Sequence, residues 1–342
     1  MPGPLLTNDE IRDNQCYRRE ALELIASDEA IGFVGAGLSV ELGYPTWPQL
    51  SDKLTALAQE VGTFVLTSTA GPAQQAEHAD AVKEFIRAET GSFGRYLNFL
   101  GREFGRRDPA FTRLQADLLR LPLRALITSN YEPSLECACA HVYPGETHSA
   151  VTIHEEHAHL VSQFLVALSR KTVPGPIAYL HGSYQDPAGM VVAATDYQVA
   201  YGLRAQSAQA PLEGSPSWPL RRRLLWALLA SRRLVFFGFS MDDVDFQVML
   251  RSVANDLWNW NESIHYAVMS IDNVDPEATK KRAALIHREF GVRVVFYENA
   301  DGSHAGVSDF VADALALCET GERGYLQAIN RRTDRIARPY ED

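Results

Sequence analysis

Small and polar residues follow four short apolar runs of the sequence, and these residue types could carry chemistry. The four clusters are Gly35-Ala36-Gly37-Leu38-Ser39, Thr128-Ser129-Asn130, His181-Gly182 and Gly238-Phe239-Ser240. Each apolar run is typical of a buried strand. Ligands bind open parallel sheets beyond the carboxyl ends of the strands, at a switch in strand order. The sequence therefore predicts that the four clusters meet at one edge of a sheet.

The first cluster has the composition of an anion-binding turn. Gly35 and Gly37 leave room for backbone N–H groups to approach phosphate oxygens, and a following helix would add its dipole. Ser39 could donate to a phosphate or ribose, or cap a helix. Val40 stands where a dinucleotide fingerprint has its third glycine, and there is no P-loop lysine. A purely structural tight turn is an equally good interpretation.

Two side chains in these clusters are candidates for catalysis. Asn130 at a strand end is commonly a turn former, but it can also hold a ribose hydroxyl or a water. His181 has the near-neutral pKa range that suits a general base, although a lone His is more often structural. The aspartates that follow Ser240, among them Asp243, fit the first turn of a helix, where carboxylates interact with the dipole.

Metal ligands do not occur at the spacings that metal sites need. The four cysteines, Cys16, Cys137, Cys139 and Cys318, include no C-x-x-C pair, so we expect neither a zinc site nor a disulfide framework. The three histidines between His154 and His159 match no zinc-protease motif, and a solvated helix face is the favoured interpretation. Reduced thiols are typical of a cytoplasmic protein, which is the location we expect.

Strand and helix patterns alternate along most of the chain. The strand patterns are Ala30–Val34, Ala125–Thr128, Ile177–Leu180, Met190–Ala193, Leu234–Phe237, His265–Met269 and Val292–Phe296. Helical patterns cover Asn8–Ser27, most of Ser51–Leu121, a stretch from Pro133, Pro219–Ala230 and Asp275–Phe290. This alternation predicts an α/β fold with a Rossmann-like, mostly parallel sheet and helices on both faces. We expect residues 1–50 and 122–315 to form that domain, 51–121 an inserted helical module, and 316–342 a C-terminal helix or tail.

Composition sets broad limits on function. The chain has 342 residues, of which 46% are hydrophobic, and 32 basic against 43 acidic residues give a net charge of −11. No apolar run approaches the ~18 residues that span a bilayer. The acidic balance disfavours direct nucleic-acid binding. The basic cluster of Arg221–Arg223, Arg232 and Arg233 is more typical of a solvated helix face or a partner contact.

Taken in order, the motifs resemble the sirtuin superfamily, and more closely its bacterial anti-phage defence branch of sirtuin-like NAD-cleaving domains. The similar stretch runs from about Ala30 to Phe296. Its pieces are GAGLS from Gly35, TSNYEPSLE from Thr128, YLHGS from Tyr179, TDY from Thr195 and GFSMDDVDF from Gly238. The resemblance implies a Rossmann-like sheet that binds NAD as substrate, with a smaller helical module beside the pocket.

The resemblance also implies roles for single residues. Asn130 and His181 match the catalytic pair of the family. The residues implied to bind NAD are Gly35, Ala36, Gly37, Ser39, Thr128, Gly238, Ser240 and Asp243. Two departures stand beside Asn130, because Glu132 replaces the usual Asp and Ser129 replaces Thr or Gln.

The reaction favoured by these features is hydrolysis of NAD to nicotinamide and ADP-ribose, with cyclic ADP-ribose as a further product if an internal nucleophile competes with water. Related deacylases carry a four-cysteine zinc module that this sequence lacks. A protein deacylase, an ADP-ribosyltransferase and a non-catalytic NAD-binding assembly module are the alternatives. The resemblance implies an effector that depletes NAD during phage infection. Because an unrestrained NADase would be toxic, we expect it to be controlled by a separate partner, such as a DNA-translocase-type ATPase or an argonaute-like protein, or by self-assembly as a homo-oligomer.

Overall fold

A seven-stranded parallel sheet forms the centre of the molecule. The computed structural model describes residues 5–65, 72–108, 110–146, 150–170, 172–202, 218–239, 247–248, 250–251, 255, 265–271, 274–299 and 304–319. The sheet order is β3 (Ala150–Thr152), β4 (Ile177–Tyr179), β2 (Leu126–Thr128), β1 (Ala30–Val34), β5 (Arg233–Phe237), β6 (His265–Ile271) and β7 (Val292–Glu298). Every neighbouring pair is parallel, which confirms the predicted α/β class.

The strand order reverses its direction at β1. From β1 the chain builds one side of the sheet through β2, β3 and β4, and it then crosses to β5, β6 and β7 on the other side. Phe33 of β1 is in register with Ile127 of β2 and with Phe236 of β5. The carboxyl end of β1 is therefore the switch point at which open parallel sheets bind ligands.

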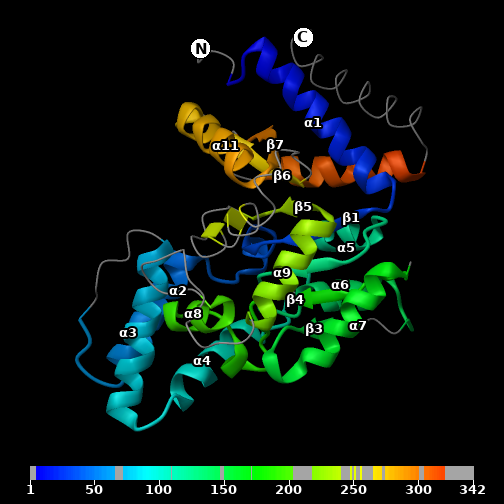
Figure 1. Cartoon of the computed structure of the whole chain (residues 1–342). Helices are drawn as coiled ribbons and strands as arrows, with labels where there is room; N and C mark the ends of the chain where they lie inside the picture. Colours follow the sequence, from blue (N-terminus) through cyan, green and yellow to red (C-terminus); the bar gives the residue numbers. More distant parts are fainter. Residues whose placement is uncertain are drawn as a thin grey trace.

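Helices cover both faces of the sheet, as predicted (Figure 1). The helices whose bounds the structure gives, on the sheet or beside it, are α1 (Asn8–Ala26), α2 (Trp47–Gln59), α3 (Pro72–Thr90), α4 (Gly94–Phe104), α5 (Arg113–Arg120), α6 (Ser134–Val142), α7 (Ala158–Ser169), α8 (Ala194–Tyr201), α9 (Leu220–Ser231), α11 (Pro276–Phe290) and a helix over residues 305–319. The predicted helical stretches are confirmed in these elements.

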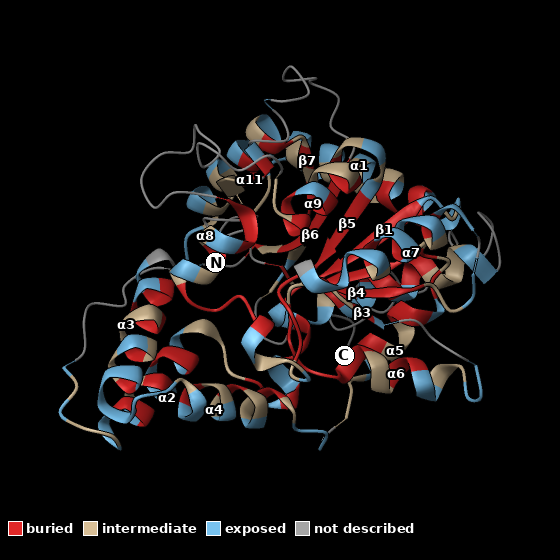
Figure 2. Cartoon of the chain, turned by 60° about the horizontal axis from the view of Figure 1, so that its bottom comes forward, coloured by how far each residue is buried: buried red, intermediate tan, exposed pale blue. Residues whose placement is uncertain are grey.

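Alternate residues of each strand point into two separate cores. Ile31 and Phe33 of β1 pack with α7, α8, α9 and α11, whereas Ala30 and Val34 pack with α1, α5, α6 and the 305–319 helix. Figure 2 shows the buried central strands beneath helices whose outer faces are exposed. Burial on both sides explains why β1 is an unbroken apolar run.

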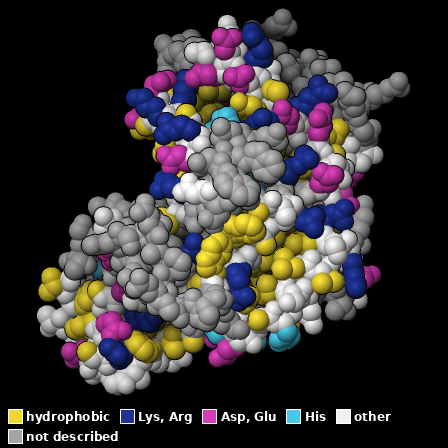
Figure 3. Space-filling view, viewed as in Figure 1, with side chains coloured by type: hydrophobic (Ala, Val, Ile, Leu, Met, Phe, Trp, Pro, Cys, Tyr) yellow, Lys and Arg dark blue, Asp and Glu magenta, His cyan; other side chains and the backbone are white. Residues whose placement is uncertain are grey.

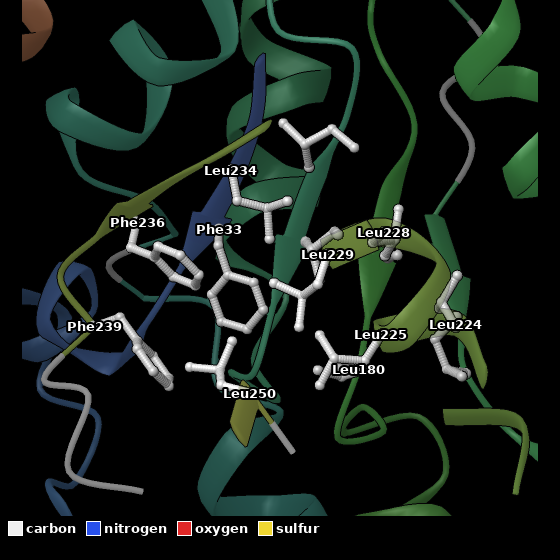
Figure 4. Close-up of a cluster of buried hydrophobic side chains, with 14 of the residues drawn as sticks. Phe33, Leu180, Leu224, Leu225, Leu228, Leu229, Leu234, Phe236, Phe239 and Leu250 are labelled. Carbon is white, nitrogen blue, oxygen red and sulfur yellow. The ribbon is translucent and has the colours of Figure 1, made fainter. Parts of the chain in front are cut away.

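The core beneath the switch point is rich in aromatic rings. The ring centroid of Phe33 lies 5.1 Å from those of both Phe236 and Phe239. Figure 4 shows these rings beside Leu250, with Leu180 close to Leu225 of α9. Because Phe239 follows Gly238 and Leu180 precedes His181, this packing anchors two of the loops predicted to form the site.

Three of these helices, α2, α3 and α4, form a block beside the sheet, which we call the helical block (Figure 1). Their buried residues make a third core that includes Leu54, Val82 and Leu100. α5 instead contributes Leu118 to the core that Ala30 and Val34 share with α1, α6 and the 305–319 helix. This helix therefore packs on that face of the sheet.

The strand predicted at Met190–Ala193 is wrong. Met190, Val192 and Ala193 are buried in the third core, against the helical block, and the segment has no strand pairing. The Val191 N–H donates to the His181 carbonyl and the Tyr131 hydroxyl donates to the Val191 carbonyl. A short apolar run thus satisfies its backbone without a sheet, while the short strand β3 was not predicted.

The surface is mixed in character. On the face of Figure 3, hydrophobic side chains gather over the region where α7 and α9 lie in Figure 1, and charged side chains surround them. Within the described residues, no helix has both the length and the apolarity that crossing a bilayer requires.

Candidate active site

The two glycine loops at the switch point pack directly against each other. The Gly35 N–H donates to the Phe237 carbonyl and the Gly37 N–H donates to the Gly238 carbonyl, both at 2.9 Å. A Cβ added at Gly35 or Gly37 would lie 2.6 Å or 2.8 Å from the Gly238 carbonyl oxygen. The glycines are therefore required by this close approach, and both N–H groups already have protein acceptors.

Part of the first loop remains open to solvent. Ala36 and Gly37 are exposed, whereas Leu38 and Ser39 are buried. Ser39 begins the turn Val40–Leu42 without a side-chain capping bond, and its hydroxyl donates to the Glu132 carboxylate. The surface that this loop offers to a ligand is therefore its backbone around Ala36 and Gly37.

Asn130 lies just beyond β2 and is held by the loop after β1. Its side-chain NH2 donates to the Gly35 carbonyl at 3.2 Å, to Ser39 Oγ at 3.1 Å and to Glu132 Oε1 at 3.1 Å. Its backbone N–H donates to Thr128 Oγ1 at 3.0 Å, and the Thr128 hydroxyl donates to the Val34 carbonyl. The structure thus brings together Gly35, Ser39, Thr128 and Asn130, as the sequence predicts.

Glu132 is a buried carboxylate at the centre of this cluster. Its Oε1 accepts from the Ser39 hydroxyl, the Asn130 NH2 and the Ser134 hydroxyl, which lies at 3.1 Å. Several hydrogen bonds to one carboxylate oxygen offset much of the cost of burying it. The longer side chain at this position is therefore fully accommodated.

Gln115 joins the same cluster from α5, and sequence reasoning did not find it. Its Nε2 donates to Ser134 Oγ at 2.9 Å and to Ser39 Oγ at 3.4 Å. Its Oε1 accepts the Thr112 N–H in a capping box at the start of α5. The T-x-x-Q spacing of that box is visible in the sequence, but its contact with Ser39 is not.

His181 lies just beyond β4 and is enclosed by α8. Its Nε2 is 2.7 Å from the Tyr201 hydroxyl, and the rings of Tyr197 and Tyr201 meet it edge-on at 5.4 Å and 5.9 Å. Burial, helped by the nearby charge of Arg221, lowers the pKa of His181 to about 3. The imidazole is therefore neutral at physiological pH, but it is a much weaker base than the near-neutral pKa range expected from the sequence would make it.

Arg221 and Arg222 are both buried, so they do not form the solvated helix face that the sequence predicts for the arginine cluster. Arg221 donates to the carbonyls of Leu180 and Gly189 at 2.9 Å and 2.7 Å. Arg222 stacks its guanidinium 4.3 Å from the Trp218 ring centroid. Arg221 consequently fixes the backbone on both sides of the His181 loop, a role that no sequence motif indicates.

The remaining predicted residues are only partly described. Gly238 contacts Gly37, whereas Ser240 and Asp243 lie outside the described residues. His157 and His159 are exposed at the start of α7, as expected of a solvated face. Among the residues that the structure describes, no group of three His, Cys, Asp or Glu side chains is placed to hold a metal ion, and all four cysteines are free.

Comparison with known proteins identifies the class to which this site belongs. A family model described as a SIR2-like domain matches residues 124–295, a range that contains Asn130, His181 and Gly238. The chain belongs to the SIR2-like domain family, which confirms the resemblance seen in its motifs.

Two curated relatives share this similarity at greater length. The NAD(+) hydrolase ThsA of Bacillus cereus (strain MSX-D12) is 23% identical over 266 residues, which cover 77% of this chain and 48% of the relative. The NAD(+) hydrolase ThsA of Enterococcus faecium is 23% identical over 258 residues, which cover 75% and 46%. The chain thus spans about half the length of the curated relatives it matches.

Proposed function

We propose that this protein hydrolyses NAD to nicotinamide and ADP-ribose. The observation that carries the proposal is the buried Asn130 cluster at the switch point of a SIR2-like parallel sheet. The NAD(+) hydrolase names of both relatives support the same substrate.

In this proposal the exposed backbone at Ala36 and Gly37 binds the diphosphate. Gly238 and Ser240 are proposed to contact a phosphate or the adenosine ribose, and Asp243 is proposed to bind NAD as well. Asn130 orients a water or a ribose hydroxyl at the nicotinamide ribose. Gly35, Ser39 and Thr128 act through their hydrogen bonds to Asn130 rather than by touching the dinucleotide. This arrangement positions the reactants, which is how enzymes remove much of a barrier.

His181 is proposed to accept the proton that the water loses. Its neutral state leaves a lone pair for the proton, but burial makes the imidazole a weak base, and Nε2 is engaged by the Tyr201 hydroxyl. Proton transfer therefore requires either that Tyr201 releases Nε2 or that Nδ1 faces the water. Either route makes α8 part of the reaction geometry.

A chromatographic product assay on the purified protein tests the function. We expect nicotinamide and ADP-ribose in equal amounts, with a loss of at least about 100-fold in Asn130→Ala. Arg19→Ala, which removes an exposed contact on α1, is the matched control and should leave turnover unchanged. Release of O-acyl-ADP-ribose with an acylated peptide would instead indicate a deacylase, and a stoichiometric complex of intact NAD would indicate a binding module.

We further propose that NAD cleavage serves anti-phage defence in the cytoplasm, that the protein assembles with itself, and that a separate partner controls it. We also propose the helical block as a module distinct from the sheet domain. An unregulated NADase would be toxic, so its specific activity should rise with protein concentration or on addition of the partner. Full activity at every concentration would contradict control by assembly.

A further inference from the structure

The Asn130 carboxamide can take only one orientation in its cluster. The Gly35 carbonyl oxygen is a pure acceptor and faces the Asn130 side chain at 3.2 Å, so the group turned toward it must be NH2. Glu132 Oε1, 3.1 Å from the same nitrogen, imposes the same orientation. Two independent acceptors, one from the β1 loop and one from the β2 loop, therefore turn the NH2 inward.

The surrounding donors are oriented just as firmly. The backbone N–H of Thr112 is a pure donor and occupies Gln115 Oε1, so Gln115 turns its NH2 toward Ser134 and Ser39. Ser39 and Ser134 then direct their own hydrogens to Glu132. Each hydrogen bond in this series therefore has a fixed donor and acceptor: Gln115 of α5 donates to the two serines, and the serines donate to Glu132 Oε1.

The orientation leaves the other end of the Asn130 side chain available. Within the part of the chain that is described, no group donates to Asn130 Oδ1, and this oxygen is not among the fully buried atoms that lack a partner. It is therefore the end of Asn130 that solvent or substrate can reach.

We propose that Glu132 is a positioning residue that holds the Asn130 NH2 inward and so presents Oδ1, a hydrogen-bond acceptor, to the substrate. The inference rests on the proposed NAD cleavage and specifies the reacting contact. Oδ1 accepts a hydrogen bond from the attacking water, and this hydrogen stays on the water oxygen. The water oxygen bonds to C1′ of the ribose as the C1′–N bond breaks, the bonding pair goes to the nicotinamide nitrogen, and His181 takes the water proton.

Two substitutions at Glu132 separate the acceptor from the rest of the side chain. Glu132→Met keeps the length of the side chain but removes Oε1. Glu132→Gln keeps an oxygen there. We expect Glu132→Met to lower kcat by about 100-fold with little change in KM, because a small misplacement of a reacting group has that effect. Glu132→Gln should retain most of the turnover.

A spectroscopic measurement tests the orientation without relying on activity. In protein labelled with 15N-asparagine, the Asn130 NH2 signal is assigned by its loss in Asn130→Asp. Its hydrogens should exchange slowly with solvent in the wild type and in Glu132→Gln, and rapidly in Glu132→Met. Unchanged melting temperatures identify variants that have kept their fold.

The results distinguish this inference from the proposed function. Slow exchange without nicotinamide release in the wild type would overturn NAD cleavage while supporting the role of Glu132 in holding Asn130. Slow exchange in Glu132→Met, or equal losses of kcat in Glu132→Gln and Glu132→Met, would overturn the positioning role.

Discussion

Gly238 occupies a backbone conformation that other residues avoid, at the point where the two glycine loops touch. Its φ is +59°, and a Cβ there would lie 2.1 Å from Leu38 Cδ1 and 2.9 Å from the Leu38 nitrogen. Gly238→Ala should therefore lower the free energy of unfolding by about 2–4 kcal/mol, through backbone strain and overpacking together. Urea denaturation measures this change.

Gly43 provides the matched control for that substitution. Its φ is +74°, but no atom lies within 4 Å of the Cβ position. Gly43→Ala should lower the free energy of unfolding by only about 1–2 kcal/mol, because strain acts there without a clash. Equal losses in the two variants would show that the loops are not in close contact.

The candidate site was predictable from sequence only where a residue sits at a strand end. Asn130 and Gly35 meet because each follows a strand of one parallel sheet. Gln115 and Arg221 reach the site from helices, through contacts that depend on how those helices pack. A sequence pattern describes local periodicity, so it contains no signal for such contacts.

At the scale of elements, α8 is connected to the helical block at its first turn. Asp196 Oδ1 pairs with Lys83 of α3 at 2.7 Å, and its Oδ2 accepts the Ala193 N–H at 2.8 Å. The same helix carries Tyr201, whose hydroxyl contacts His181. The position of His181 therefore depends on how α8 sits against α3.

Removing the Asp196 carboxylate should loosen this connection. We expect Asp196→Ala to lower the free energy of unfolding by about 1–2 kcal/mol, since the start of α8 loses its cap and Lys83 loses its partner. Turnover should fall as well, because Tyr201 moves with α8. Thermal melts measure the stability of both Asp196→Ala and a control, Asp9→Ala. Asp9 belongs to a highly exposed ion pair on α1, and its substitution should change the free energy of unfolding by less than about 0.5 kcal/mol. If Asp196→Ala loses stability but keeps full turnover, the position of α8 does not affect the reaction.

Most elements were predictable because their apolar patterns match how they are buried. Ala30–Val34 is covered on both faces and is uniformly apolar. Met190–Ala193 has the same pattern for another reason, since helices of the helical block bury it. The sequence records that a segment is buried, but not whether a strand or a helix lies beside it.

For the molecule as a whole, two of the buried histidines, His181 and His265, predict how stability responds to acid. Burial lowers the pKa of His181 to about 3 and that of His265 to about 4, from 6.5. The unfolded chain therefore binds protons first as the pH falls. The stability that these two neutral side chains contribute is fully present above about pH 6.5 and is lost progressively toward pH 4 and pH 3.

Substitution of His265 tests this expectation away from the candidate site. His265 Nδ1 accepts the Leu234 N–H at 3.2 Å, and the side-chain amide oxygen that His265→Asn introduces would offer an uncharged acceptor in its place. The variant should lose less stability than the wild type between about pH 7.5 and pH 4.5, measured by urea denaturation. His159→Asn, at an exposed position, should follow the wild type. If stability depends on pH in His265→Asn as it does in the wild type, the lowered pKa of His265 does not contribute to the loss of stability in acid.

The pairing of β1 with β5 also determines when, during synthesis of the chain, the candidate site can fold. Ala30 pairs with Arg233, and the Gly37 N–H donates to the Gly238 carbonyl. The loop after β1 therefore cannot form these contacts until the ribosome has added β5 and Gly238, much later in synthesis. A nascent chain that has already produced Asn130 still lacks the second loop of the switch point. Synthesis itself thus delays assembly of the site, which would keep an incomplete chain from carrying out the proposed cleavage on the NAD of the cell that is making it.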